Sequence, residues 1–178
     1  MLRWAVAMAE VRRGRRAAVT TIGPLVERSR AALNGIPDIA WRDPYLVGFM
    51  LTLITIVARI ENPDLQDHDL SLVQSQAWGA ITGMDADLLG EEALTLSKLH
   101  PREFQHGSYS AMMVATRLCG PAVASIGYEP WQVTETLLEP DASAADDSHI
   151  SRSLSPATGN WADAFDTYIA GLPLAKLP

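Results

Sequence analysis

Residues 43–60 read DPYLVGFMLTLITIVARI, and this stretch dominates the hydrophobic pattern of the chain. Asp43 is a favoured N-cap residue and Pro44 is favoured at the first helical position, so a helix is predicted to begin here. The longest apolar run of the chain extends from Tyr45 to Ala58. A membrane-spanning helix needs about 20 apolar residues, whereas a helix that is apolar nearly all round is typically buried in protein. We therefore interpret this helix as the centre of the fold and expect no transmembrane segment.

The less apolar residues of this helix share one face. Gly48, Thr52, Thr55 and Arg59 follow one another at spacings of four, three and four residues, which places them on one stripe. Small residues along such a stripe allow another helix to approach closely. We expect the stripe to contact either another helix of the same domain or a second copy of the chain across a dimer interface.

The remainder of the chain also carries helical signals. No run alternates between apolar and polar residues as a half-buried strand would. Glycine and proline mark the helix ends, and a kink or break is expected at Gly23-Pro24. We predict an all-α fold, a compact helical bundle of five to seven helices around the apolar central helix. The predicted helices span residues 2–34, 44–60, 69–82, 86–99, 101–118, 130–138 and 161–170.

Length and composition divide the chain into three parts. The 178 residues suffice for one domain, and we assign residues 1–138 to a helical domain with a basic N-terminal helical segment. Residues 139–160 are rich in Asp, Ser, Ala, Gly and Pro, which is typical of a flexible acidic linker. Residues 161–178 are predicted to form a C-terminal helix and tail. This helix packs either on its own domain or on a neighbouring subunit.

The net charge of −7 is unevenly distributed. Residues 1–34 carry seven Arg and two Glu, whereas the rest of the chain carries 7 basic and 19 acidic residues. Such asymmetry indicates either an acidic partner for the basic end or a solvated helix face. The acidic remainder gives no strong nucleic-acid signal, because such binding needs many phosphate contacts from one basic surface. The candidate contacts to a protein partner or an anionic surface are Arg12, Arg13, Arg15 and Arg16.

The densest group of reactive residue types lies between residues 100 and 106. Glu103 and His106 are three residues apart on a predicted helix, so their side chains can converge. His100, Glu103 and His106 are candidate catalytic residues for general acid–base chemistry. Glu103 and His106, together with His68, are candidate metal ligands, although the second Glu-x-x-His pair of a di-iron bundle is missing from the predicted helices. Cofactor and substrate stay unknown, and enzymatic activity is an open question.

Cys119 is the only cysteine, so an intramolecular disulfide is excluded, as is usual in a reducing cytoplasm. We expect Cys119 to pack in the core at a helix end. The first residues lack the apolar core of a secretory signal. The chain is therefore expected to be a cytoplasmic protein that acts by association with a protein partner, as a homodimer. The alternatives are a metal-binding protein or enzyme with a Glu/His site, and an anionic-surface binder through the Arg-rich N-terminus.

Overall fold

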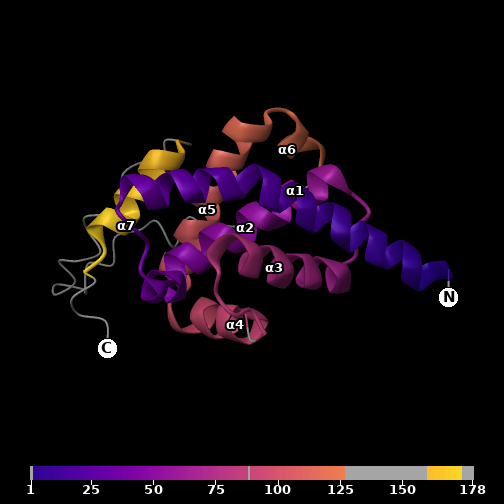
Figure 1. Cartoon of the computed structure of the whole chain (residues 1–178), viewed down its shortest axis with the longest axis horizontal. Helices are drawn as coiled ribbons and strands as arrows, with labels where there is room; N and C mark the ends of the chain where they lie inside the picture. The colour runs from indigo at the N-terminus through magenta and orange to yellow at the C-terminus, as the bar shows by residue number, and fades with distance from the viewer. Residues whose placement is uncertain (1, 88, 127–159, 174–178) are drawn as a thin grey trace.

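The computed structural model describes residues 2–87, 89–126 and 160–173 and confirms the all-α fold (Figure 1). Within these ranges the regular structure is helical throughout. The predicted helix at 130–138 and the predicted linker up to residue 159 lie outside the described residues. In chain order the elements are α1 (Leu2–Ala32), a 3₁₀ helix (Asp38–Arg42), α2 (Pro44–Glu61), α3 (Asp67–Thr82), α4 (Leu89–Leu99), α5 (Pro101–Cys119), α6 (Ala122–Ser125), a π-helical segment (Ala162–Asp166) and α7 (Thr167–Gly171).

α2 is the centre of the structure, as its apolar run predicts. Asp43 caps it, because one carboxylate oxygen accepts hydrogen bonds from the backbone N–H groups of Tyr45 at 2.9 Å and Leu46 at 3.2 Å. Every residue from Tyr45 to Ala58 is buried. The helices α1, α3, α4, α5 and α6 all pack against α2, which lies among them in Figure 1. Among the described residues, α2 alone is long and apolar enough to cross a membrane, and these neighbours bury it as a core helix.

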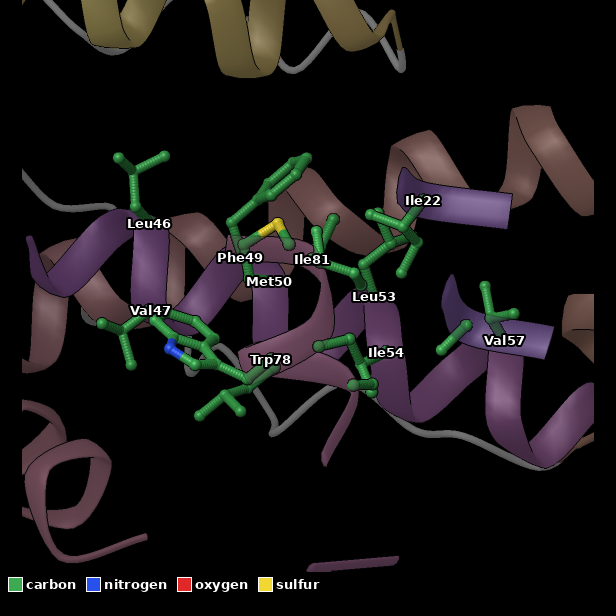
Figure 2. Close-up of a cluster of buried hydrophobic side chains, with 14 of the residues drawn as sticks. Ile22, Leu46, Val47, Phe49, Met50, Leu53, Ile54, Val57, Trp78 and Ile81 are labelled. Carbon is green, nitrogen blue, oxygen red and sulfur yellow. The ribbon is translucent and has the colours of Figure 1, made fainter. Parts of the chain in front are cut away.

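The side chains of α2 fill the core in several directions. Figure 2 shows Leu46, Phe49 and Leu53 extending from α2, with Ile22 of α1 beside Leu53. In the same cluster, Trp78 of α3 packs against the face of α2 that carries Val47 and Ile54. Burial of one such side chain contributes about 1.5–3 kcal/mol, so this helix is the main source of hydrophobic stabilisation.

α2 and α5 touch backbone to backbone, and two glycines permit this contact. A Cβ atom added to Gly107 of α5 would lie 2.8 Å from the carbonyl carbon of Tyr45 and would overlap the carbonyl oxygen. A Cβ atom added to Gly48 of α2 would lie 3.1 Å from the carbonyl carbon of Phe104 and would again overlap the oxygen. The close approach predicted at Gly48 is therefore confirmed, and its partner helix is α5.

Thr55 and Arg59, at the other end of the stripe that begins at Gly48, contact α3. Thr55 accepts a hydrogen bond from the Gln74 side chain at 2.8 Å. Arg59 forms an ion pair with Asp67, the first residue of α3, at 3.0 Å. The stripe is therefore covered by two helices of its own chain, which is the first of the two alternatives that the sequence left open.

α1 continues through the point where the sequence predicts a kink or break. It runs unbroken through Gly23 and Pro24, so the predicted break is wrong. A proline inside a helix costs about 3 kcal/mol, because it lacks an N–H donor and crowds the preceding turn. Ile22 and Val26, on either side of it, are completely buried. Burial of each contributes about 1.5–3 kcal/mol, which offsets the cost of the proline.

The C-terminal helix predicted from Trp161 is present in residues 161–171, and its first turn is π-helical. Its buried side chains Trp161, Phe165 and Ile169 recur every four residues, so they lie on one face. The Trp161 ring lies 5.7 Å from that of Phe49, and the Phe165 ring lies 6.0 Å from that of Trp41. In this structure the helix thus packs on its own chain.

Replacement of Gly107 by alanine is expected to lower the free energy of unfolding by about 1–3 kcal/mol or more, because the new methyl group meets the backbone of α2. Urea denaturation measures the effect. Gly90→Ala in α4 is the matched control, since a Cβ atom there meets nothing within 4 Å. Equal losses in the two variants would contradict the proposed role of the close contact.

Candidate functional site

The three candidate catalytic residues lie at the start of α5. His100 occupies the N-cap position and is exposed, whereas Glu103 and His106 are half-buried and one turn apart. Burial lowers the pKa of His106, which favours the neutral imidazole. The ring of His106 lies 5.3 Å from that of Tyr45 in α2. The two members of the predicted pair therefore lie where α5 crosses the first turn of α2.

The structure does not gather the candidate metal ligands at one place. Across the described ranges, no group of three or more His, Cys, Asp or Glu side chains is arranged to hold a metal ion. His68 is exposed in the first turn of α3, on a different helix from Glu103 and His106. Metal binding by these residues stays a prediction from the sequence.

Two residues that the sequence did not single out for the candidate site, Asp43 and Tyr168, lie close enough to Glu103 for its charge to affect them. The Tyr168 hydroxyl donates a 2.9 Å hydrogen bond to the same Asp43 oxygen that caps α2. Burial raises the pKa of Asp43, hydrogen bonds from Tyr168 and from the backbone of Leu46 and Tyr45 lower it in part, and the charge of Glu103 adds a smaller upward contribution. Burial also raises the pKa of Tyr168, as do the charges of Asp43 and Glu103. Three polar side chains from distant parts of the sequence thus share one electrostatic environment.

Tyr45 joins this group to the C-terminal helix. Its ring stacks on that of Tyr168 with a centroid separation of 3.9 Å. Its hydroxyl donates a 2.8 Å hydrogen bond to the carbonyl oxygen of Ala164. Burial raises the pKa of Tyr45 to about 12, so the hydroxyl stays a donor at neutral pH. We call Asp43, Tyr45, Glu103, His106 and Tyr168 the tyrosine junction.

Three residues of the tyrosine junction, Asp43, Tyr45 and Tyr168, form hydrogen bonds with other parts of the same chain. Asp43 accepts from two backbone N–H groups and from Tyr168, while Tyr45 donates to the backbone of the C-terminal helix. These hydrogen bonds hold the C-terminal helix on the start of α2, whereas general acid–base chemistry at His100, Glu103 and His106 stays a prediction.

Ser29 of α1 forms a second polar contact with the C-terminal helix. It is completely buried and accepts a 2.8 Å hydrogen bond from the indole N–H of Trp161. Its hydroxyl also contacts the carboxylate of Asp166 and the carbonyl oxygen of Leu25. The sequence offered no signal for this contact, because Ser29 and Asp166 are 137 residues apart.

The four clustered arginines form an exposed face of α1. On the opposite face, Val11 and Ala18 are completely buried, and a Cβ atom on Gly14 would lie 3.3 Å from Val73 of α3. Within the described part of the chain, ion pairs form at Arg30, Arg42 and Arg59 but at none of the four clustered arginines. We call this exposed set, Arg12, Arg13, Arg15 and Arg16, the basic face.

Cys119 is the last residue of α5 and is only partly buried, although it packs against the core. Burial raises the pKa of its thiol, which disfavours the reactive thiolate. The expected packing role is therefore supported, in a more exposed position than the sequence suggested.

No protein-family model, curated protein or solved structure matches this chain.

Lowering the pH from 7.5 to 5.5 is expected to reduce the free energy of unfolding through His106. The unfolded chain takes up a proton near the ordinary histidine pKa of 6.5, whereas the folded chain, with its lowered pKa, does so only at lower pH. The raised pKa of Asp43 has the opposite effect, because it stabilises the folded chain as the pH falls. This effect operates between the ordinary aspartate pKa of 3.8 and the raised pKa of the folded chain. Urea denaturation at the two pH values measures the effect.

The substitution His106→Gln is expected to reduce this pH dependence. The exposed His100 provides the control, because His100→Gln is expected to retain the slope of the unaltered protein. If all three proteins show the same change in unfolding free energy between pH 5.5 and 7.5, burial of His106 does not control it.

Proposed function

We propose that this protein acts by association with a second copy of itself, through oppositely charged surfaces on α1 and α4. The observation that carries this proposal is the basic face, where four exposed arginines lack an ion pair within the described residues. The lone cysteine supports a reducing compartment, and we propose the cytoplasm as the place of action.

The complementary surface lies at the start of α4. Four exposed carboxylates gather in this part of the sequence, and among the described residues only Glu92 has a basic partner, Arg42 at 4.0 Å. Exposed ion pairs at such a distance contribute little, so these carboxylates keep their attraction for an external cation. We call Asp85, Asp87, Glu91 and Glu92 the acidic edge.

The basic face and the acidic edge are separated within one molecule. α1 and α4 both pack against α3, which lies between them in Figure 1. The arginines also point away from the core side of α1, where Val11 and Ala18 are buried. A second copy can present its acidic edge to the basic face, and with twofold symmetry the same contact forms twice.

The strength of such an interface depends on ionic strength. An exposed ion pair contributes about 0.2–1 kcal/mol, and charges further apart than about 10 Å are largely screened in 0.1 M salt. The proposed dimer is therefore expected to form at low salt and to dissociate as salt is added. A protein with a similar acidic surface would compete for the same arginines.

Charge reversal tests the proposal. Replacing the four arginines of the basic face by Glu is expected to weaken self-association at least about tenfold in low salt, because attraction becomes repulsion. Sedimentation equilibrium of the full chain measures the dimerisation constant. The single substitution Arg28→Glu, at another exposed position of α1, is the control for the single substitution Arg13→Glu. It is expected to change the dimerisation constant much less.

A complementary variant sharpens the test. Replacing the four residues of the acidic edge by Arg is expected to weaken self-association as well, whereas an equimolar mixture of the two reversed proteins is expected to form heterodimers. Failure of the mixture to associate would contradict this interface. An unaltered protein that stays monomeric but binds anionic vesicles through the four arginines would establish the anionic-surface alternative in its place.

A further inference from the structure

The C-terminal helix is bound to the rest of the chain as a separate peptide would be bound. Its hydrogen-bond partners Ser29, Asp43 and Tyr45 lie between 119 and 137 residues earlier in the sequence. All three belong to α1 or the start of α2. The contacts of this helix are therefore specific tertiary contacts between remote segments.

The apolar anchors of this helix are deeply buried. Trp161 is 7% exposed, Phe165 is completely buried and Ile169 is 3% exposed. Aromatic anchors at four-residue spacing are the usual means by which an amphipathic helix binds a groove on another protein. Polar groups of the surface below complete the match, because Ser29 accepts from the Trp161 indole and Tyr45 donates to Ala164.

The surface below the helix includes residues of α1, the 3₁₀ helix and α2, and α5 also contacts the first turn of the helix. We call Ser29, Trp41, Asp43, Tyr45 and Phe49 the acceptor surface. Its aromatic rings lie 3.9–6.1 Å from one another or from the rings of the bound helix. All of these contacts join residues that the structure describes.

We infer that the acceptor surface also binds the C-terminal helix of a second copy, so that two copies exchange their C-terminal helices. A second copy carries the identical helix and thus makes the identical contacts, which is why exchange of an element is a low-cost route to a dimer. The 33 residues from 127 to 159 separate the helix from α6, and such a length can reach up to about 110 Å when extended.

The length of chain between α6 and the C-terminal helix also affects whether the helix binds its own acceptor surface or that of a second copy. The helix is tethered to its own site through the chain, and such tethering gives an effective concentration of the order of millimolar. Because the cost of closing a loop rises only slowly with its length, exchange becomes comparable when the protein concentration approaches that value. The exchanged contact is mainly apolar, so it is expected to survive salt that dissociates the contact between the basic face and the acidic edge. This inference therefore goes beyond the proposed charged interface and can fail independently of it.

Binding of a labelled peptide tests the acceptor surface. A fluorescein-labelled peptide of residues 160–173 is titrated with the full chain in 1 M NaCl, and its anisotropy is measured. The full-length variant Trp161→Ala/Phe165→Ala, whose own helix has lost its anchors, is expected to bind the peptide at least about tenfold more tightly than the unaltered chain. The matched control is the same peptide with alanine in place of both aromatic residues, which is expected not to bind.

A variant of the acceptor surface locates the binding site. Adding Ser29→Ala to that double variant removes the partner of the Trp161 indole and is expected to weaken peptide binding about fivefold or more, because a buried donor is left unpaired. Ser71→Ala, on the exposed side of α3, is the control and is expected to leave binding unchanged.

Exchange itself is measured on the unaltered chain. Uniformly ¹⁵N-labelled and unlabelled proteins are concentrated together in 1 M NaCl, and native mass spectrometry is expected to show dimers of mixed mass that excess peptide dissociates. This measurement also decides the matter if the double variant does not fold. Dimers that are absent, or that excess peptide leaves intact, would overturn the inference, as would a folded double variant that does not bind the peptide.

Discussion

The backbone contact between α2 and α5 is the constraint on which the other features of this structure depend. Gly48 and Gly107 each lie against a carbonyl group of the opposite helix, so the two axes approach more closely than any side chain would permit. Because the contact lies near the start of both helices, it brings the cap of α2 next to Glu103 and His106. The same closeness places Tyr45 where its ring stacks on Tyr168 of the C-terminal helix.

The polar residues of the structure fall into two groups with different surroundings. Those of the tyrosine junction and Ser29 are at least partly buried, and their hydrogen bonds join α1, α2 and the C-terminal helix. A buried polar group that lacks its hydrogen-bond partner lowers the stability of the fold, and this requirement makes the arrangement of these residues specific. The arginines of the basic face are exposed and act over longer distances through solvent. Different residues thus determine the specific contacts within the chain and the attraction for charged groups outside it.

The sequence was sufficient to predict what depends on local pattern. The apolar run from Tyr45 to Ala58, the cap at Asp43 and the small residue at Gly48 each gave the correct element and the correct environment. Gly107 gave no such signal, because a single glycine in a helical pattern has the same appearance whether or not another backbone lies against it. The break expected at Pro24 failed because burial of Ile22 and Val26 depends on tertiary neighbours.

The candidate site was harder to predict for the same reason. Glu103 and His106 were found from their spacing, but the partners that define their surroundings, Asp43 and Tyr168, are separated from each other by 125 residues. No period or motif connects such positions. Hydrogen bonds between remote segments follow from the fold, so they become visible only once the crossing of α2 and α5 is known.

The position of the C-terminal helix has a consequence for synthesis of the chain on the ribosome. Its aromatic partners Trp41, Tyr45 and Phe49 all precede position 50, whereas the helix itself is translated only after α5. At about 5–20 residues per second, the interval between the end of α5 and the completion of this helix lasts roughly several seconds. During that interval Trp41, Tyr45 and Phe49 lack their cover in every nascent chain. Neighbouring ribosomes on one message therefore bring together chains whose aromatic surfaces are open at the same moment.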